Sequence, residues 1–406
     1  MSDYKKRALN ALNKPAAYGP DLNLEEYSRN VGKWENTPIS ELPQEIQLGA
    51  LSCGVTPRVR ERAGTFFQID HTVVTSDVQN QFEDKAEVMS TKEALDRYDW
   101  FKDYWWKLVP VDMDKYTALA ELEWDHGYFI HVHEGEKITL PLQSCLFMAN
   151  ENVDQNVHNV IILEPDSKAQ LITGCVVHPN LRKGLHVGVS EFYLKKGSKL
   201  TFTMIHNWKQ NVDVRPRTSV LLEKNATFVN NYVLLKPVRS IQTFPTAHCK
   251  GDGSRAVFNS IVYASAESYV DLGAKVILDG DETRADVSSR AIATDRSVVY
   301  ARGVLVGNTP GSRAHLECNG LLLSDNASIH AIPELVGNVS GTELSHEAAV
   351  GKIAEEQVQY LMARGFSEQE ATSLIIRGFM DIRVFGLPEF LEKEIQRAID
   401  LTTGAL

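Results

Sequence analysis

The chain has 406 residues, of which 43% are hydrophobic and 23% charged, and its formal net charge is -11. This length is too great for one compact core, and the composition is typical of a soluble globular protein. The acidic balance gives a nucleic-acid partner no general electrostatic support, and no apolar run approaches the roughly 18 residues of a membrane-spanning helix.

The N-terminal segment and the cysteines restrict the cellular setting. Residues 1–10 are polar and contain Lys5, Lys6 and Arg7. They lack the apolar core of a secretory signal, so we expect a cytoplasmic protein. An odd number of widely spaced cysteines without a CxxC pair argues against a disulfide framework and against a zinc finger. The cysteines are Cys53, Cys145, Cys175, Cys249 and Cys318.

Residues 1–118 form a first zone that we expect to be helical, with helices near residues 24–34 and 92–106. The second of these stretches is rich in aromatic residues, which predict that it packs against a neighbouring element. The aromatic residues are Tyr98, Trp100, Phe101, Tyr104, Trp105 and Trp106.

Residues 119–340 form a second zone of short β-rich runs. The predicted strands are Tyr128–Val132, 160–163, 171–177, 191–194, 200–205, 220–222, 227–235, 298–306 and 320–323. Many runs are bounded by a turn in which Gly, Asp or Asn precedes Ser or Ala, because these residues tolerate or stabilise turn conformations. The turns begin at Asp166, Gly197, Asn225, Gly311 and Asn326.

The spacing of these turns indicates a repeat. The first three turns are separated by 31 and 28 residues and the last two by 15 residues, all near multiples of 15. An irregular all-β repeat fits a sandwich or a solenoid, and the repeated turn favours a parallel β-helix. Because such a stack has open strand edges at both ends, we expect the flanking helical zones to cap it.

Residues 341–406 form a third zone that we expect to be helical. A helix is predicted over residues 346–364, ended by Gly365, and Ser367 with Glu370 forms a capping box for the next helix. Pro388 opens a last predicted helix. Apolar residues recur at helical spacing here and indicate either internal packing or a surface for a partner. They include Ile375, Phe379 and Phe390.

The chain lacks several motifs of nucleotide and hydrolytic chemistry. It contains no GxxxxGK[ST], no GxGxxG between a strand and a helix, no HExxH and no GxSxG. The chain is therefore not predicted to be an enzyme, and any ATP hydrolysis must come from a partner.

Two polar groupings offer alternatives. His131 and His133 form an HxH pair whose side chains share one face of a strand, as two metal ligands require. Asp252, Asp271 and His248 are conceivable acid–base residues of a carbohydrate-active β-helix enzyme, although nothing groups them in the sequence.

Two cysteines are stronger candidates. Cys175 and Cys318 both lie in predicted strands, where a cysteine is often only a buried apolar residue. A thiolate can also bind iron and sulfide or carry a persulfide sulfur. His346 and Glu347 open the third zone, and a helix starting there would bring an imidazole and a carboxylate near Cys318.

Residues 345–353 resemble the signature that opens the C-terminal domain of the SufB and SufD proteins, and the similarity continues through residues 356–379. Further upstream, five stretches resemble segments of this family, and the resemblance covers about residues 98–400. These stretches are residue 135 with residues 140–143, then residues 174–175, 185–186, 205–208 and 316–322.

The resemblance implies a mainly β protein, with a right-handed parallel β-helix between N-terminal and C-terminal helical domains. It implies a scaffold of the SUF machinery that assembles a transient iron–sulfur cluster, [4Fe–4S] or [2Fe–2S]. It also implies a SufC-type ATPase that docks on the C-terminal helices, a second SufB/SufD-type subunit, a sulfur donor and recipient apo-proteins. We expect the second subunit to be another copy of this chain.

The resemblance also assigns site residues. Cys175 matches the sulfur acceptor, while Cys318 and Glu347, with His346 beside them, match the residues that hold the nascent cluster. Arg215 and Arg217, in a neighbouring β segment, are candidate cations that would lower the pKa of the Cys175 thiol. The residues predicted to dock the ATPase are Ile375, Phe379 and Phe390.

SufD proteins usually lack both cysteines and carry Gly in place of Glu347. Because this chain has Cys175, Cys318 and Glu347, we interpret it as SufB-like. A SufD-like accessory role in iron entry or complex integrity, without a cluster of its own, is the alternative.

Overall fold

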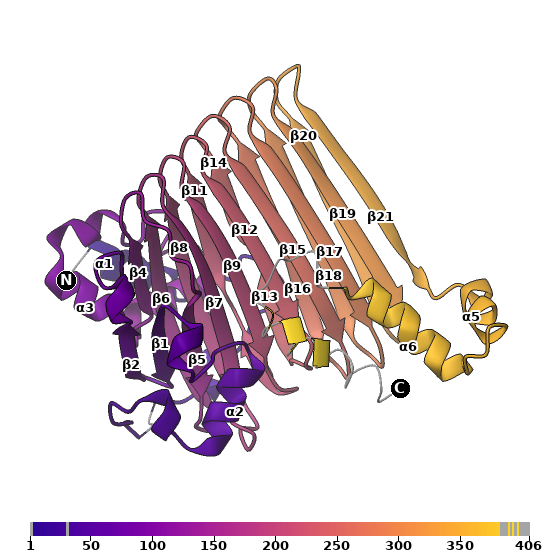
Figure 1. Ribbon diagram of the computed structural model, residues 1–406, viewed down its shortest axis with the longest axis horizontal. Helices are drawn as coiled ribbons and strands as arrows, with labels where there is room; N and C mark the ends of the chain where they lie inside the picture. Colours follow the sequence, from indigo (N-terminus) through magenta and orange to yellow (C-terminus); the bar gives the residue numbers. More distant parts are fainter. Residues whose placement is uncertain (1–2, 30–31, 382–388, 390–391, 394–395, 398–406) are drawn as a thin grey trace.

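The computed structural model describes residues 3–29, 32–381, 389, 392–393 and 396–397. Its centre is a parallel β-solenoid of about 8 turns, with helices at both ends. The N-terminal helices lie around one end, and the last strands and the C-terminal helices lie at the other (Figure 1). No helix in the described ranges is long and apolar enough to cross a membrane. The predicted β-helix with flanking helices is confirmed.

Each turn of the solenoid contributes to two facing sheets. The sheet that holds Cys175 contains β1 (Gly64–Ile69), β2 (Thr72–Val78), β5 (Leu142–Met148), β7 (Lys168–Val177), β9 (Lys199–Asn207), β12 (Thr227–Leu234), β15 (Arg255–Ala264), β17 (Arg284–Ala293), β19 (Arg313–Leu322) and β21 (Glu343–Lys352). We call it sheet B. The facing sheet A contains β3 (Ala86–Ser90), β4 (Tyr128–Val132), β6 (Val153–Leu163), β8 (Gly184–Leu194), β10 (Val212–Val214), β11 (Arg217–Leu222), β13 (Ser240–Thr243), β14 (Thr246–Cys249), β16 (Tyr269–Leu278), β18 (Val298–Gly307) and β20 (Ser328–Gly337).

The predicted turns mark the corners of the coils. Asp166, Gly197, Asn225 and Gly311 all have positive φ angles, between 58° and 76°. At Gly197 a Cβ would lie only 2.1 Å from Asp166 Oδ1, so the stacked turns leave no room for a side chain there. The turn spacing therefore predicts the coil repeat correctly, because each corner must sit on the corner of the coil before it.

The core lies between the two sheets. Alternate side chains of each strand point inward, and the inner positions are apolar over most of the stack. Four phenylalanines continue this core through its middle, one from sheet A and three from successive strands of sheet B, and the ring centroids of contacting pairs are 4.9 to 6.5 Å apart. They are Phe192, Phe202, Phe228 and Phe258. Because each coil buries the coil before it, an end coil needs a cap.

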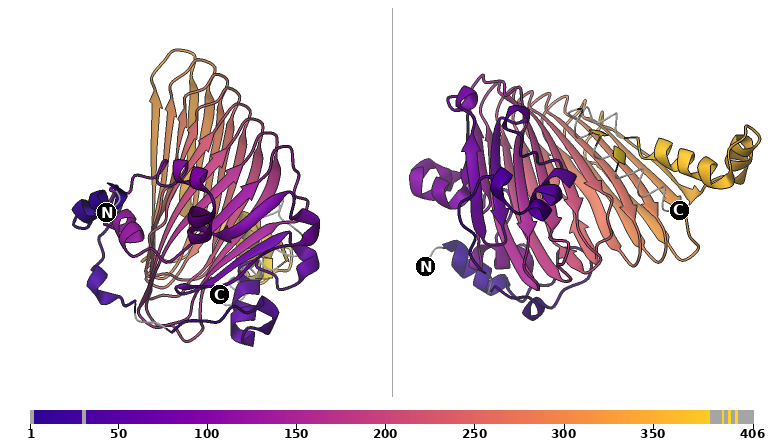
Figure 2. Two further views of the ribbon diagram at one scale, coloured as in Figure 1. Left: turned by 90° about the vertical axis from the view of Figure 1, so that its left-hand side faces the viewer. Right: turned by 60° about the horizontal axis from the view of Figure 1, so that its bottom comes forward.

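The N-terminal segment covers the first coils, as the left view of Figure 2 shows. It is less helical than expected, because β1, β2 and β3 extend the two sheets and only short helices separate them. Only α3 and a 3-10 turn form in the aromatic stretch. The helices are α1 (Asp3–Ala11), η1 (Leu24–Glu26), η2 (Ile39–Glu41), α2 (Gln44–Ser52), η3 (Val59–Glu61), η4 (Asn80–Phe82), α3 (Thr91–Arg97), η5 (Asp99–Asp103) and α4 (Lys115–Leu122).

The C-terminal end differs from the sequence expectation. The solenoid strands continue to Lys352, and His346 and Glu347 lie on β21 and not on a helix. Residue by residue pairing with β19 overrides the helical propensity of this Ala-rich stretch. The next helices are α5 (Glu355–Met362) and α6 (Glu368–Phe379). The capping box of Ser367 and Glu370 forms as predicted.

Candidate functional site

Cys175 lies on the inner face of β7 and is fully buried. Its register partners are Leu146 on β5 and His206 on β9. Gly174, the preceding residue, faces outward, where a Cβ would lie 2.2 Å from Cys53 Sγ. The Gly-Cys pair thus places one thiol inside the solenoid while a second cysteine from the end of α2 packs closely on the outside.

The environment of Cys175 is not the one expected for a free thiolate. Burial, and next the nearby Cys53, raises the pKa of the Cys175 thiol well above its ordinary value. The expectation that a nearby cation lowers the pKa of the Cys175 thiol is therefore wrong while Cys175 is buried. The thiol is protonated at neutral pH until its surroundings change.

Arg215 and Arg217 have other partners. They belong to the sheet A side, whereas Cys175 is on sheet B. Arg215 donates to Val214 O and Ser240 Oγ. Arg217 forms a buried ion pair with Asp114, at 2.7 Å. Both guanidinium groups also lie over one tyrosine ring, that of Tyr116. The structure thus joins these arginines to the start of α4 and gives them a packing role.

Polar side chains that the sequence interpretation did not single out lie beside Cys175. His206, its register partner on β9, is 3.0 Å from the Tyr232 hydroxyl through Nδ1. Burial holds the pKa of His206 well below its ordinary value, so the imidazole is neutral. While both groups stay buried, the lowered pKa of His206 and the raised pKa of Cys175 oppose proton transfer from the thiol to the imidazole. In the sequence, the signal for His206 is its place in the 205–208 stretch that resembles SufB.

A column of polar side chains leads from this point toward Cys318. Parallel register aligns Tyr232 on β12 with Ser260 on β15, then Ser289 on β17, then Cys318 on β19. The Oγ of Ser289 is buried without a hydrogen-bond partner. A cavity of about 40 Å³ adjoins the three hydroxyl-bearing residues of sheet B and reaches Leu272 and Ala274 of sheet A. The hydrogen bond between His206 and Tyr232 links the neighbourhood of Cys175 to this column, and the cavity lies between the two cysteines without reaching either of them.

Cys318 lies at the C-terminal end of the column, and only 2% of its surface is exposed. Burial, with a smaller effect of Glu317, raises the pKa of its thiol to about 11. His346, on β21, is paired with Leu316 and therefore points inward like Cys318. The buried Nε2 of His346 has no hydrogen-bond partner. An orphaned imidazole nitrogen beside a thiol suits a metal-containing cargo.

Glu347 lies on the opposite face of the sheet. It is exposed, and it pairs with Glu317, which also points outward. Within one chain the strand alternation separates its carboxylate from the inward-facing Cys318 and His346. The structure thus brings two of the three predicted ligands to one face of sheet B and the third to the other face.

Two of the three residues predicted to dock the ATPase lie on α6 and are partly buried. Phe379 packs against the chain's own core together with the buried Ile376 and Met380, and Ile375 is half-buried. Phe390 lies outside the described residues. The exposed large apolar side chains of the helical segment are Tyr360, Met362, Phe366 and Leu374.

The residues considered for acid–base chemistry do not form a site. Asp271 pairs with Arg302, at 2.6 Å, and Asp252 lies near Lys224 in a turn. His248 lies on β14, with its pKa lowered by burial and by Lys250. By contrast, His131 and His133 do meet a carboxylate, that of Glu87.

Comparison with known proteins identifies the family. Residues 146–379 match the family described as "SUF system FeS cluster assembly, SufBD core domain". An iron–sulfur cluster assembly SufBD family protein of Methanothermobacter thermautotrophicus strain Winter is 47% identical over 99% of both chains. A SufBD family protein of Archaeoglobus fulgidus is 45% identical over 84% of this chain and 90% of its own length.

The iron–sulfur cluster assembly protein SufB of Bacillus subtilis is 31% identical over 98% of this chain and 88% of its own length. The matched core spans most of the solenoid, including Cys175, the polar column and Cys318. The chain therefore belongs to the SufBD family of the SUF iron–sulfur cluster assembly system.

Proposed function

We propose that this chain is a SufB-like scaffold, which receives sulfur at Cys175 and holds a nascent iron–sulfur cluster near Cys318 before the cluster passes to apo-proteins. The observation that carries the proposal is the inner polar column, since both cysteines face the same interior and hydroxyl groups line the space between them. A purely structural solenoid gains nothing from such a column, because buried hydroxyl groups cost free energy unless they are hydrogen-bonded.

Sulfur enters from a donor at the side of the solenoid. An open cavity of about 750 Å³ is lined by Val176 and Val177, which follow Cys175, and by Trp208. Because Cys175 is fully buried, this region must open before the thiol can accept a sulfur. Opening hydrates both groups and removes the burial that lowers the pKa of His206 and raises the pKa of Cys175. His206 then takes the thiol proton, and the thiolate attacks the sulfane sulfur of a donor persulfide, whose own thiolate leaves.

The sulfur must move freely between the two cysteines. Five strand steps of about 4.8 Å separate β7 from β19 in sheet B, so the thiols are on the order of 24 Å apart and cannot react directly. We propose that hydrosulfide carries the sulfur along the column. Its release from a Cys175 persulfide consumes two electrons, which a thiol reductant supplies as it becomes a disulfide.

The cluster is proposed to form where two subunits meet at the open end of the solenoid. Cys318 and His346 face the interior there, and Glu347 faces outward on the last strand. A cluster that contacts all three must therefore lie beyond the edge of β21, where side chains of both faces converge with those of a second copy. The burial of Cys318 means that the end must open first.

A SufC-type ATPase is proposed to drive this opening. It would dock on α5 and α6, where these helices and the loop between them carry four exposed apolar side chains soon after the last coil. ATP-dependent closure of the helices would displace β21, to which they are directly joined. The chain itself supplies binding and positioning in this scheme.

A SufD-like accessory role is the second candidate, and the outward position of Glu347 favours it. In that role the chain has no cluster of its own, and it supports iron entry or complex integrity. Loss of a cluster on Cys318→Ser would distinguish the scaffold from this alternative.

The test is anaerobic reconstitution with ferrous iron and sulfide, followed by visible absorption spectra of the wild type, Cys318→Ser and Cys249→Ser. Cys249 is the matched control, because it is a buried inward-facing cysteine of sheet A. We expect thiolate-to-iron charge-transfer absorption in the wild type and in Cys249→Ser, and its loss in Cys318→Ser. Equal absorption in all three proteins would contradict the assignment of Cys318. The absence of a cluster from all three proteins in the presence of the ATPase and ATP would contradict it as well.

A further inference from the structure

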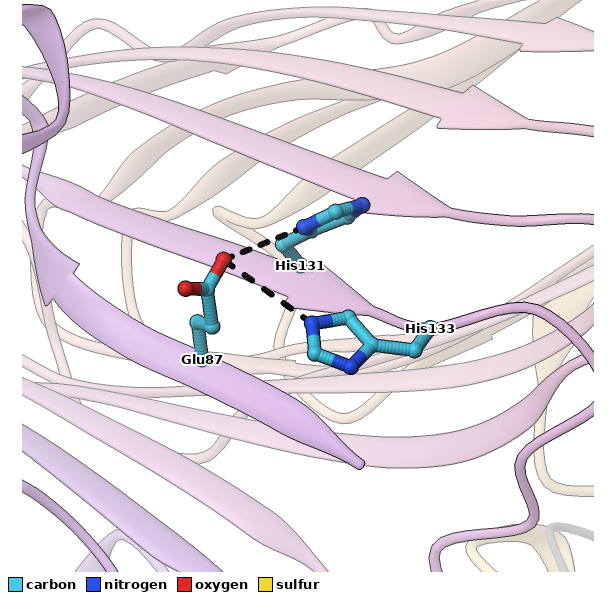
Figure 3. A group of neighbouring side chains, drawn as sticks. All are labelled: Glu87, His131 and His133. Carbon is cyan, nitrogen blue, oxygen red and sulfur yellow. Dashed lines mark hydrogen bonds and ion pairs between the residues drawn. The ribbon is translucent and has the colours of Figure 1, made fainter. Parts of the chain in front are cut away.

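The pair His131 and His133 meets Glu87 at the N-terminal end of the solenoid, as Figure 3 shows. Glu87 lies on β3 and is the register partner of His131 on β4. His133 follows β4 directly, and its N–H donates to Lys85 O, so the pairing of the two strands continues past it. All three side chains therefore project from paired backbone and not from a loop.

The facing ligand atoms are at distances suited to one small ion. His131 Nδ1 is 3.1 Å and His133 Nε2 is 4.0 Å from Glu87 Oε2, and the three ligand atoms lie within 4.8 Å of one another. Ligand atoms held about 2.1 Å from a tetrahedral ion are about 3.4 Å apart. A shift of the side chains by less than 1.5 Å, roughly the difference between these spacings, would complete the site.

The outward-facing nitrogen of each imidazole already has an acceptor. His131 Nε2 is 3.1 Å from Glu164 Oε1, and His133 Nδ1 is 2.9 Å from the main-chain oxygen of Asp84. Histidines that bind metals almost always donate their second ring N–H to a carboxylate or a main-chain carbonyl, which fixes the ring and its tautomer. Here both rings are held so that the remaining nitrogen faces Glu87.

The surroundings keep the cluster rigid and partly open. The Trp100 ring lies 5.4 Å from the His131 ring, and the Tyr98 hydroxyl donates to the other oxygen of Glu87. The side chains of His131, Glu87 and His133 are 14%, 22% and 37% exposed, so an ion can enter from solvent. An ion held here would keep coordination positions for water or a further ligand.

We propose that Glu87, His131 and His133 form a binding site for a divalent first-row transition metal ion, Fe²⁺ or Zn²⁺. Two imidazoles and one carboxylate are a ligand set that both ions accept, whereas Mg²⁺ and Ca²⁺ prefer oxygen ligands. The site lies at the end of the solenoid opposite to β21, and it does not rest on the proposed scaffold function (Figure 1).

The test uses the full-length protein after treatment with a chelator. Co²⁺ serves as the optical probe, because its visible bands report imidazole and carboxylate ligands while a sulfur-to-cobalt charge-transfer band would reveal binding to a cysteine. Zn²⁺, and Fe²⁺ under anaerobic conditions, then compete for the site, and these two arms identify which ion binds more tightly.

Four variants define the ligands. His133→Gln and Glu87→Gln each remove one ligand and should weaken Co²⁺ binding by more than the roughly 10- to 100-fold loss that an outer partner causes. Glu164→Gln changes such an outer partner and should weaken Co²⁺ binding by about 10- to 100-fold. The matched control is His178→Gln, which disrupts another surface histidine–carboxylate pair, that of His178 and Glu45 at 2.8 Å, and should bind as the wild type does. Circular dichroism verifies that each variant is folded.

Equal binding by the wild type, His133→Gln and Glu87→Gln would overturn the proposal, since the ion would then lie elsewhere. Absence of Co²⁺ and Zn²⁺ binding by the wild type would overturn it as well. In that case the cluster is a hydrogen-bonded ion pair that only joins β3 to β4. A cobalt spectrum dominated by sulfur charge transfer that is lost in Cys318→Ser would also contradict the site.

Discussion

At the scale of single residues, the interior of this solenoid is notable for the polar groups that it buries. His186, His206, Tyr232 and Trp208 lie together near Cys175, with the His186 and Trp208 rings 5.3 Å apart. Burial favours the neutral form of each titratable group, so these side chains carry no charge near neutral pH. Their protonation therefore links the stability of the fold to pH.

His186 should make the protein less stable in mild acid. Burial lowers its pKa to about 3, whereas the unfolded chain has a histidine pKa near 6.5. Between these values the unfolded state binds the extra proton, so the free energy of unfolding falls as the pH falls, by about 2 kcal/mol at pH 5. His186→Asn keeps a hydrogen-bond donor for Gln155 Oε1. In this variant the free energy of unfolding should depend less steeply on pH.

Urea unfolding at several pH values between 5 and 7.5 measures this difference. Titrating groups distant from His186 contribute equally to both proteins and cancel in the comparison. Parallel pH profiles for the wild type and His186→Asn would show that the His186 imidazole takes up its proton without loss of stability.

Arg217 should matter for folding and not for sulfur chemistry. Its ion pair with Asp114 joins β11 to the N-terminus of α4, with both side chains buried. Arg217→Met leaves an unpaired buried carboxylate and should lower the free energy of unfolding by about 3–5 kcal/mol. The double variant Arg217→Met/Asp114→Asn keeps the helix cap and should recover part of the loss, as measured by chemical denaturation.

At the scale of elements, the last coil differs from those before it. Leu305 on β18 is fully buried, but its register partner Leu335 on β20 is 40% exposed. Val350 on β21 also points inward and is 42% exposed. Within the described residues, no strand pairs with the free edge of β20 or β21. An open, apolar strand edge of this kind favours pairing with a second copy.

We predict that the chain dimerises through this end. Leu335→Glu should place a charge in the interface and shift the protein to monomer in size-exclusion chromatography with light scattering. Leu48→Glu is the matched control, because Leu48 is 57% exposed on α2 near the other end. A dimer that persists in Leu335→Glu but dissociates in Leu48→Glu would place the interface at the N-terminal end.

At the scale of the whole molecule, the solenoid behaves as a stack in which each coil is stabilised by its neighbours. The middle coils are covered on both sides, and the first coils are covered by the N-terminal segment. Among the residues that the structure describes, the last coil has a neighbouring strand on one side only. Stability should therefore be graded along the stack, with the most labile region next to Cys318, where the proposed function requires opening.

Hydrogen exchange should reveal this gradient. Amides of β12 and β15 should exchange slowest and those of β21 fastest among the strands, because the latter have an exposed edge. The protection of β21 should rise with protein concentration as dimers form, while that of β12 stays constant. Uniform exchange over all coils would contradict a graded stack.

Much of the coil architecture was predictable from the sequence. The turn residues Asp166, Gly197, Asn225 and Gly311 occupy the corners, since their conformational needs are local, and all nine predicted strands coincide with observed ones. The thiols at Cys175 and Cys318 were likewise located in strands. These features depend on short-range preferences, which a single sequence expresses directly.

Other features were decided by tertiary structure. The strand at His346 replaces an expected helix because pairing with β19 outweighs local propensity. The polar column from Tyr232 to Cys318 exists only through register between residues 28 or 29 positions apart. The outward position of Glu347 and the pairing of Arg217 with Asp114 likewise depend on which face of a sheet meets which neighbour. Sequence determined the repeat and its chemistry, whereas long-range register determined which side chains meet, because no local signal encodes it.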